Sequence, residues 1–231
     1  MSAVSVPIIT IDGPSGSGKG TVARRVAGQL GWHLLDSGAL YRLVAYAGEQ
    51  HGVDPADEAG FAAAARNLDV RFDADLHGEE QIWLAGVEVS RSIRTEQAGE
   101  GASRVAVMPQ VRAALVDRQH AFATPPGLVA DGRDMGTVIF PSAGLKIFLT
   151  ASADERARRR YKQLKDKGLS ANLAALSLEI AARDRRDANR PLAPLKPADD
   201  AVIVDSTSMS IDAVVARVLE LAAARFPRSS G

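Results

Sequence analysis

The chain has 231 residues, 46% of them hydrophobic, which is enough for one folded domain with a sizeable core. Its 28 Lys and Arg balance 28 Asp and Glu, and this zero net charge argues against a protein that binds long nucleic acid. The chain has no cysteine, which excludes disulfides, thiol catalysis and cysteine-bound metal clusters, and its 4 histidines lack metal-ligand spacing. Because no apolar run approaches about 18 residues and the N-terminal stretch resembles a first strand rather than a secretion signal, we expect a cytoplasmic protein.

Short apolar runs rich in β-branched residues alternate with helical patterns along the chain. The first run, VPIITID at residues 6–12, precedes a helical pattern at residues 19–30 that places Val22, Val26 and Leu30 on one face. Runs without polar alternation are typical of strands buried on both faces. We therefore predict an α/β fold, a five-stranded parallel sheet with helices on both faces. The predicted strands are residues 6–12, 33–36, 128–131, 145–150 and 201–205, and a second helix is predicted at residues 38–51.

Two stretches interrupt this alternation. Residues 48–101 carry 12 acidic and 4 basic residues, and residues 68–72 and 81–89 alternate between polar and apolar side chains. This pattern predicts helices and a small antiparallel sheet, inserted after the second strand. Residues 151–190 carry 11 basic and 6 acidic residues, so this region is suited to meeting anions.

A glycine-rich segment, GPSGSGKGT at residues 13–21, stands between the first predicted strand and its helix. Glycines let the backbone curl so that amide groups point at phosphate oxygens, and the following helix adds the positive end of its dipole. Lys19 can reach the outer phosphates of a nucleotide. The segment matches GxxxxGK, although Gly20 stands where Ser or Thr usually follows the lysine, and it does not match the dinucleotide pattern GxGxxG. The sequence therefore predicts a phosphate-binding loop.

The GKGT form of this loop is typical of nucleoside monophosphate kinases. A regulatory GTPase also has a phosphate loop, but the segment after residues 145–150 is ASADER and not an NKxD base-reading motif. Four more segments follow in order: LLDSGALYR at residues 34–42, ADGRDMGT at 130–137, ERARRR at 155–160 and RDRRDANR at 183–190.

Together with the loop, these segments closely resemble the bacterial cytidylate kinase family over nearly the whole chain. The resemblance implies transfer of the γ-phosphoryl group of ATP to CMP or dCMP, with Mg²⁺, giving CDP or dCDP and ADP. It also implies one kinase domain with a core, a nucleotide-binding insert and a mobile lid. The expected bounds are residues 1–47, 102–153 and 169–231 for the core, 48–101 for the insert and 154–168 for the lid.

For the phosphoryl donor, the resemblance assigns the phosphates of ATP to the glycine-rich segment and Lys19. Phosphoryl transfer needs charge neutralisation and in-line positioning more than a covalent nucleophile, which suits a lysine here. Asp131 ends a predicted strand and is the candidate carboxylate for Mg²⁺, through water; the alternative is a helix or loop cap. Thr21 or Ser17 is the candidate hydroxyl ligand, and Gly20 leaves that choice open. The implied ATP-binding residues are Gly13, Pro14, Ser15, Gly16, Ser17, Gly18, Lys19, Gly20 and Thr21.

For the acceptor, Arg42 and Arg133 resemble the residues that receive the CMP phosphate, and guanidinium forks suit two phosphate oxygens. Asp134, Arg112 and Ser103 resemble the cytosine readers. A carboxylate matches the amino group of cytosine, and an arginine matches its N3 and O2 acceptors. An alternative for Ser103 is an ordinary helix serine.

Three residues at i, i+4 and i+7, Arg183, Asp187 and Arg190, share one helix face. The family assigns Arg183 and Asp187 to the sugar hydroxyls and Arg190 to the same pocket. The alternative is a plain surface ion pair, worth only about 0.3–0.5 kcal/mol. Ser37 lies beside the implied acceptor pocket, or else it caps the helix that follows it.

The implied lid carries Arg156, Arg159 and Arg160 on one side of a helix. They can close over the triphosphate, supply positive charge to the transition state and expel water. Arg159 is the strongest candidate, whereas the sequence does not separate Arg156, Arg158 and Arg160; the alternative is a solvated basic helix. The predicted catalytic residues are Lys19, Arg133 and Arg159.

Two other functions compete with this interpretation. A related small-molecule kinase would take a different acceptor, and the base-reading pair Asp134 and Arg112 argues against it. A nucleic-acid-binding or regulatory protein would use the basic helix, but that helix carries only one aromatic residue, Tyr161, and no stacking platform. We expect no nucleic-acid or membrane partner, and a monomer, because the family suggests one and no coiled-coil heptad opposes it.

Overall fold

The computed structural model describes residues 6–74, 80–166 and 170–227. The chain divides into two compact units, which are described separately. The first unit comprises Met1–Asp36 and His120–Gly231, and the second comprises Ser37–Gln119. The second unit begins directly after the second strand and extends beyond the expected insert at residues 48–101 on both sides.

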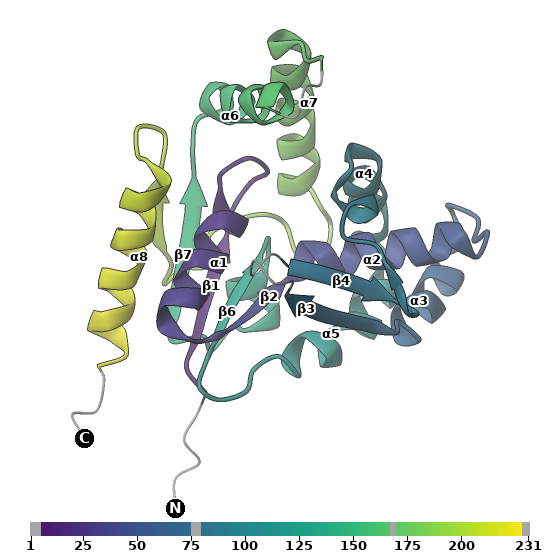
Figure 1. Cartoon of the computed structure of the whole chain (residues 1–231), viewed down its shortest axis with the longest axis horizontal. Coiled ribbons are helices and arrows are strands. Elements are labelled where there is room, and N and C mark those ends of the chain that lie inside the picture. Colours follow the sequence, from purple (N-terminus) through teal and green to yellow (C-terminus); the bar gives the residue numbers. More distant parts are fainter. Residues whose placement is uncertain (1–5, 75–79, 167–169, 228–231) are drawn as a thin grey trace, which may run out of the picture. The chain divides into compact units, whose positions relative to one another are not determined.

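The first unit is built on a five-stranded sheet, as the sequence predicts (Figure 1). All four strand pairings are parallel, and the strand order is β2-β6-β1-β7-β8. In this register Ile11 pairs with Asp131 on one side and with Ile147 on the other. The carboxyl ends of the strands therefore meet at one edge, where ligands bind in open parallel sheets. The strands are β1 (Ile8–Asp12), β2 (His33–Asp36), β6 (Leu128–Gly132), β7 (Leu145–Thr150) and β8 (Val202–Asp205).

Helices cover both faces of this sheet. The helices α1 (Lys19–Leu30) and α8 (Ile211–Arg225) share one apolar core with Ile9 and Ile11 of β1. Thr10 points to the opposite face, because side chains alternate along a strand. That face carries the short π-helix η2 (Met135–Ile139), where a Cβ on Gly136 would lie 2.8 Å from Thr10 Oγ1. Only glycine permits this approach of η2 to the sheet.

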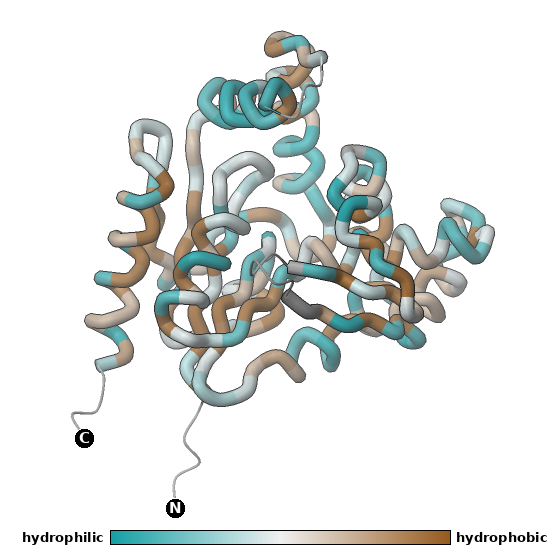
Figure 2. Tube along the Cα trace, in the orientation of Figure 1, coloured by the Kyte–Doolittle hydropathy of each residue, from teal (hydrophilic) through white to brown (hydrophobic). Residues whose placement is uncertain are grey.

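Two helices, α6 (Ala153–Asp166) and α7 (Leu173–Ala188), pack against each other after β7 (Figure 1). Figure 2 shows that α6 is hydrophilic along most of its length, whereas the strands of the parallel sheet are largely hydrophobic. The lid expected at residues 154–168 falls mainly on α6, and its terminal glycine at position 168 lies outside the described residues. Among the described residues, no helix combines the length and apolarity that a membrane crossing requires.

The second unit contains the predicted small antiparallel sheet, with strand order β3-β4-β5. Ala85 and Gly86 connect β4 to β5 with φ values of 47° and 79°, as a tight hairpin of the I′ type requires. A Cβ on Gly101 would lie 3.1 Å from Ala45 Cβ, so glycine lets α4 approach α2 closely. The elements are α2 (Ser37–Gln50), α3 (Glu58–Arg66), β3 (Val70–Ala74), β4 (Glu80–Leu84), β5 (Val87–Glu88), η1 (Ser92–Arg94) and α4 (Glu96–Val105), followed by α5 (Pro109–His120).

Candidate active site

The phosphate loop connects β1 to α1, and its glycines are required by its shape. A Cβ on Gly13 would lie 2.0 Å from the carbonyl oxygen of Leu149, which no side chain could tolerate. Gly16 and Gly18 have φ values of 78° and 90°, in the left-handed region that favours glycine. Lys19 is the first residue of α1, and its Nζ donates to the carbonyl of Pro14 at 3.4 Å.

Asp131 lies at the carboxyl end of β6 and is 6% exposed. Its Oδ1 has no hydrogen-bond partner among the described residues, so its side chain gives no sign of the capping role that was the alternative for this residue. A Cβ on Gly20 would lie 3.1 Å from Asp131 Oδ2. A serine at this position would crowd the carboxylate, which gives a physical reason for the GKG sequence.

Burial shifts the pKa values of the charged groups at this end of the sheet. Burial raises the pKa of Asp131 to about 7, although the nearby Lys19 opposes the shift. Burial, followed by repulsion from Arg133, lowers the pKa of Lys19 to about 8, while Asp131 acts in the opposite sense. The lysine therefore remains protonated at neutral pH partly because the carboxylate is beside it.

We expect kcat/KM for ATP to fall as the pH rises above about 8. The pKa of Lys19 is lowered to about 8, so its ammonium group loses its proton and its charge in that range. This ratio reports groups of the free enzyme, and one titration changes it by about tenfold per pH unit. Asp131→Asn removes a charge that raises the pKa of Lys19, so the decline should begin at lower pH in this variant. Measured pH profiles of kcat/KM test both statements, and an unshifted profile in Asp131→Asn would contradict the coupling.

Asp12, the last residue of β1, is a positioning residue that the sequence motifs do not reveal. It is 5% exposed, and its two carboxylate oxygens accept hydrogen bonds from the backbone amides of Met135 and Gly136, each at 2.8 Å. Asp12 thereby caps η2, whereas Asp134, directly before η2, makes no cap hydrogen bond with its side chain. An acidic residue at the end of a buried strand, just before the loop, is the only sequence signal for this role.

We expect Asp12→Asn to change how stability depends on pH. Burial raises the pKa of Asp12 from 3.8 to about 6, so its contribution to stability is greatest below pH 3.8 and is lost as the pH rises through 6. A pKa shift of this size corresponds to a change of about 3 kcal/mol in the free energy of unfolding. Urea unfolding of both proteins between pH 4 and 7 measures the effect. The pKa of Asp131 is also raised, so both proteins should lose stability as the pH rises for that reason. The test is therefore the difference between the free energies of unfolding of wild type and Asp12→Asn at each pH. A difference that does not change with pH would contradict the expectation.

Asp187 of α7 is fully buried, with 0% exposure, and accepts hydrogen bonds from two arginines. Arg133 Nε donates to its Oδ2 at 2.7 Å, and Arg190 donates to its Oδ1. Arg133 also donates from Nη1 to the carbonyl of Gly13 at 3.0 Å. These contacts exclude the surface pair that was the alternative for Asp187, and they join α7 to the phosphate loop. Arg183 lies one helical turn before Asp187.

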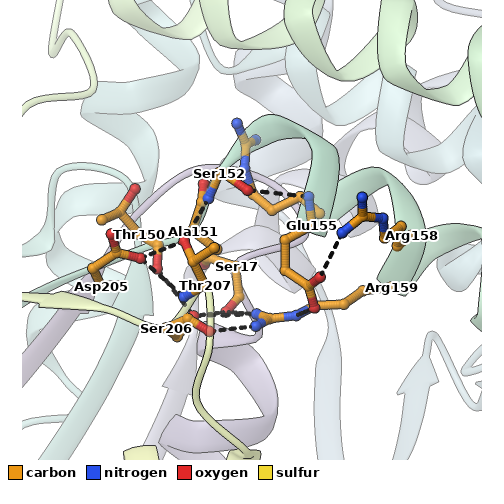
Figure 3. A network of polar contacts seen from close by, with 11 residues as sticks. Ser17, Thr150, Ala151, Ser152, Glu155, Arg158, Arg159, Asp205, Ser206 and Thr207 are labelled. Carbon is orange, nitrogen blue, oxygen red and sulfur yellow. Dashed lines mark hydrogen bonds and ion pairs between the residues drawn. The ribbon is translucent and has the colours of Figure 1, made fainter.

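The predicted lid arginines differ in their surroundings. Arg156 is 5% exposed and forms a two-point ion pair with Asp184 of α7. Arg159 donates to Ser206 and to the carbonyl of Ser17, as Figure 3 shows. Arg160 instead donates to Gln163, within its own helix.

In the second unit, the predicted acceptor-binding residues lie on three helices. Ser37, the first residue of α2, donates from Oγ to Oε1 of the buried Gln119 at 2.8 Å. Arg42 donates from Nη1 to the carbonyl of Ile93 at 3.1 Å. Arg112, on α5, donates to Tyr41 Oη and to the carbonyl of Ala106, each at 3.4 Å, and Ser103 lies half-buried on α4.

Comparison with known proteins agrees with this chemistry. The family model described as cytidylate kinase matches residues 9–224. The chain belongs to the cytidylate kinase family. A cytidylate kinase of Azotobacter vinelandii is 60% identical over 220 residues, which cover 94% of this chain and 96% of that protein. A cytidylate kinase of Pseudomonas paraeruginosa is 61% identical over 217 residues, which cover 93% of this chain and 94% of that protein.

Among solved structures, a shikimate kinase from Acinetobacter baumannii matches 96% of each chain, with 17% identity and a TM-score of 0.44. The family assignment therefore rests on the sequence relatives. Membership in the cytidylate kinase family confirms the predicted class of enzyme, a phosphotransferase.

Proposed function

We propose that the protein transfers the γ-phosphoryl group of ATP to CMP or dCMP, giving CDP or dCDP and ADP. The observation that carries this proposal is the phosphate loop with Lys19 beside the buried Asp131, in a chain 60% identical to a cytidylate kinase over 94% of its length. Lys19 and the loop amides would bind and orient the phosphates of ATP and neutralise the charge of the transferred group.

The residues near the loop suit Mg²⁺, which prefers oxygen ligands and keeps several waters and phosphate oxygens. The described residues contain no cluster of three His, Cys, Asp or Glu side chains that could hold a metal by themselves. Asp131 Oδ1 and Ser17 Oγ are buried and have no hydrogen-bond partner among the described residues. Asp131, through water, and Ser17 or the exposed Thr21 are therefore the proposed ligands. When bound, the ion supplies further neutralisation of phosphate charge.

For the acceptor, we propose that Arg42 and Arg133 bind the phosphate of CMP. Asp134 lies directly before η2 and is 5% exposed, and we propose that its carboxylate accepts from the cytosine amino group. The proposed partners of Asp134 in reading the base are Arg112 and Ser103. The remaining assignments are Ser37 beside the base, Arg183 and Asp187 at the sugar hydroxyls, and Arg190 in the same pocket.

A coupled spectrophotometric assay with ATP and a panel of nucleoside monophosphates tests this function. We expect turnover with CMP and dCMP to exceed turnover with AMP and GMP by a wide margin. Turnover only with a non-nucleotide acceptor would favour a related small-molecule kinase, and nucleic-acid binding without turnover would favour a regulatory protein. Lys19→Ala prepared in the same way controls for contaminating kinases.

We further propose that the protein acts as a monomer in the cytoplasm, without nucleic-acid or membrane partners. The absence of a heptad pattern supports the monomer, and the balance of 28 basic and 28 acidic residues supports the absence of a nucleic-acid partner. Light scattering after size-exclusion chromatography, with and without ATP, measures the mass directly. A mass of twice 24.4 kDa would contradict the monomer.

A further inference from the structure

Three alternate carbonyl groups of the phosphate loop accept hydrogen bonds from arginines. Arg133 Nη1 donates to the carbonyl of Gly13 and Arg156 Nη1 to that of Ser15, each at 3.0 Å. Arg159 Nη1 donates to the carbonyl of Ser17 at 3.2 Å. The amide groups of such a loop donate hydrogen bonds to phosphate, so its carbonyl groups need donors from elsewhere in the protein. Backbone polar groups are rarely left unpaired when buried. These three arginines supply the partners.

Each of these arginines is also paired with a carboxylate of α6 or α7. Arg133 Nε lies 2.7 Å from Asp187 Oδ2, and Arg156 Nη2 lies 2.5 Å from Asp184 Oδ2. Arg159 Nε lies 2.9 Å from Glu155 Oε1, on the same helix (Figure 3). The loop is therefore joined to the two helices by three arginine–carboxylate pairs, two of them reaching α7.

Arg156 is the most buried of these three arginines, with its side chain 6% exposed against 15% for Arg133 and 24% for Arg159. Its Nε donates to the carbonyl of Ala151 at 3.0 Å. Its Nη1 donates to the carbonyl of Ser15 and to Asp184 Oδ1, and its Nη2 donates to Asp184 Oδ2. All three guanidinium nitrogens thus have protein partners, and the side chain is buried. A Cβ on Gly16 would lie 3.1 Å from Arg156 Cβ, so the loop runs directly against this side chain. These contacts indicate that Arg156 supports the loop and does not contact the triphosphate.

We infer that Arg156 and Asp184 are positioning residues, which hold the phosphate loop against α6 and α7 in the conformation that receives ATP. Asp184 fixes the plane of the guanidinium through two hydrogen bonds, and the guanidinium in turn fixes the carbonyl of Ser15. Displacing Asp184 on α7 would move the loop, so the pair also couples α6 and α7 to the ATP site. The kinetic part of the test rests on the proposed function.

Arg156→Lys is the informative variant. A lysine keeps the charge and can pair with Asp184, but its single ammonium group cannot also serve Ala151 and Ser15 in the same geometry. We expect KM for ATP to rise about tenfold, the effect of losing one charge-assisted hydrogen bond, while KM for CMP changes less than about twofold. Asp184→Asn should give the same pattern, because its amide can accept from only one of the two guanidinium nitrogens.

Two readouts separate positioning from a general loss of stability. Hydrogen exchange should accelerate at residues 13–21 in both variants and stay unchanged in α8. Calorimetry should show weaker ATP binding without any acceptor present. Arg185→Lys, at the exposed position next to Asp184, is the matched control and should behave as wild type.

Unchanged exchange at residues 13–21 together with an unchanged KM for ATP would overturn the inference. An equal rise of KM for ATP and CMP, with faster exchange throughout the first unit, would overturn it as well, in favour of a purely structural role. Absence of CMP turnover in the wild type would contradict the proposed function alone, since exchange and ATP calorimetry still test the pair.

Discussion

Replacing Lys19 with alanine is expected to lower kcat by about 10²–10³-fold, the cost of removing one preorganised charge beside a transferred group. Lys19 is the first residue of α1, directly after the loop glycines. The carboxylate of Asp131 raises the pKa of Lys19, whereas the positive charge of Arg133 lowers it. No other lysine lies within the phosphate loop, residues 13–21. Steady-state kinetics at saturating ATP and CMP measure the effect, and a near-wild-type kcat would contradict the assignment.

The stability of this variant provides an internal control. Removing Lys19 relieves the cost of burying its charge but also takes away the cation that favours the charged form of the buried Asp131, so two opposing effects act on the free energy of unfolding at pH 7. Arg25→Ala is a matched change on the same helix, because Arg25 is 44% exposed and pairs with the exposed Asp212. It should leave kcat unchanged. A Lys19→Ala protein that unfolds at much lower urea would make its kinetics uninformative, and Lys19→Met, with its retained aliphatic chain, then replaces it.

Asp134→Asn is expected to remove most of the preference for CMP over UMP. Cytosine offers an amino hydrogen to the carboxylate, whereas uracil places a carbonyl oxygen there, so two acceptors would face each other. A buried charge left unpaired costs several kcal/mol, enough for discrimination of about 10³ or more. The amide of asparagine can flip to donate or to accept. CMP phosphorylation should therefore fall steeply, while UMP phosphorylation falls less or rises.

The measurement is the ratio of kcat/KM for CMP to kcat/KM for UMP, in wild type and in Asp134→Asn. Asp117→Asn, an exposed change of the same chemistry on α5, should leave this ratio unchanged. Equal ratios in wild type and Asp134→Asn would show that Asp134 does not read the base. Because Asp12 provides the cap of η2, loss of the Asp134 charge should not unfold that helix.

Much of the fold could be predicted from local patterns. The helix predicted at residues 19–30 is α1 with the same bounds, because a glycine-rich loop precedes it and Gly31 ends it in the left-handed conformation that favours glycine. The small sheet was predictable because residues 81–89 alternate in polarity and Gly86 supplies a hairpin turn. Both signals are contained within a few neighbouring residues.

The candidate site was less predictable, because its arrangement depends on contacts between distant segments. Arg156 and Arg160 share the same helix and the same spacing pattern, yet the first is buried against Asp184 and the second bonds to Gln163. Nothing in the sequence near them separates these surroundings. Asp12 accepts from amides more than a hundred residues along the chain, so its role follows from the sheet and not from a motif.

The close approach of Gly13 to Leu149 has a consequence for the minimal nucleotide-binding fragment. The whole glycine-rich motif lies within residues 13–21, but β1, which carries it, pairs with β6 on one side and with β7 on the other. The carbonyl of Leu149, on β7, forms part of the wall against which the loop turns. A fragment that ends before β6 would contain every residue of the motif and still lack the surface that shapes it. Nucleotide binding is therefore a property of the assembled sheet, and on a ribosome it would arise only after β7 has emerged.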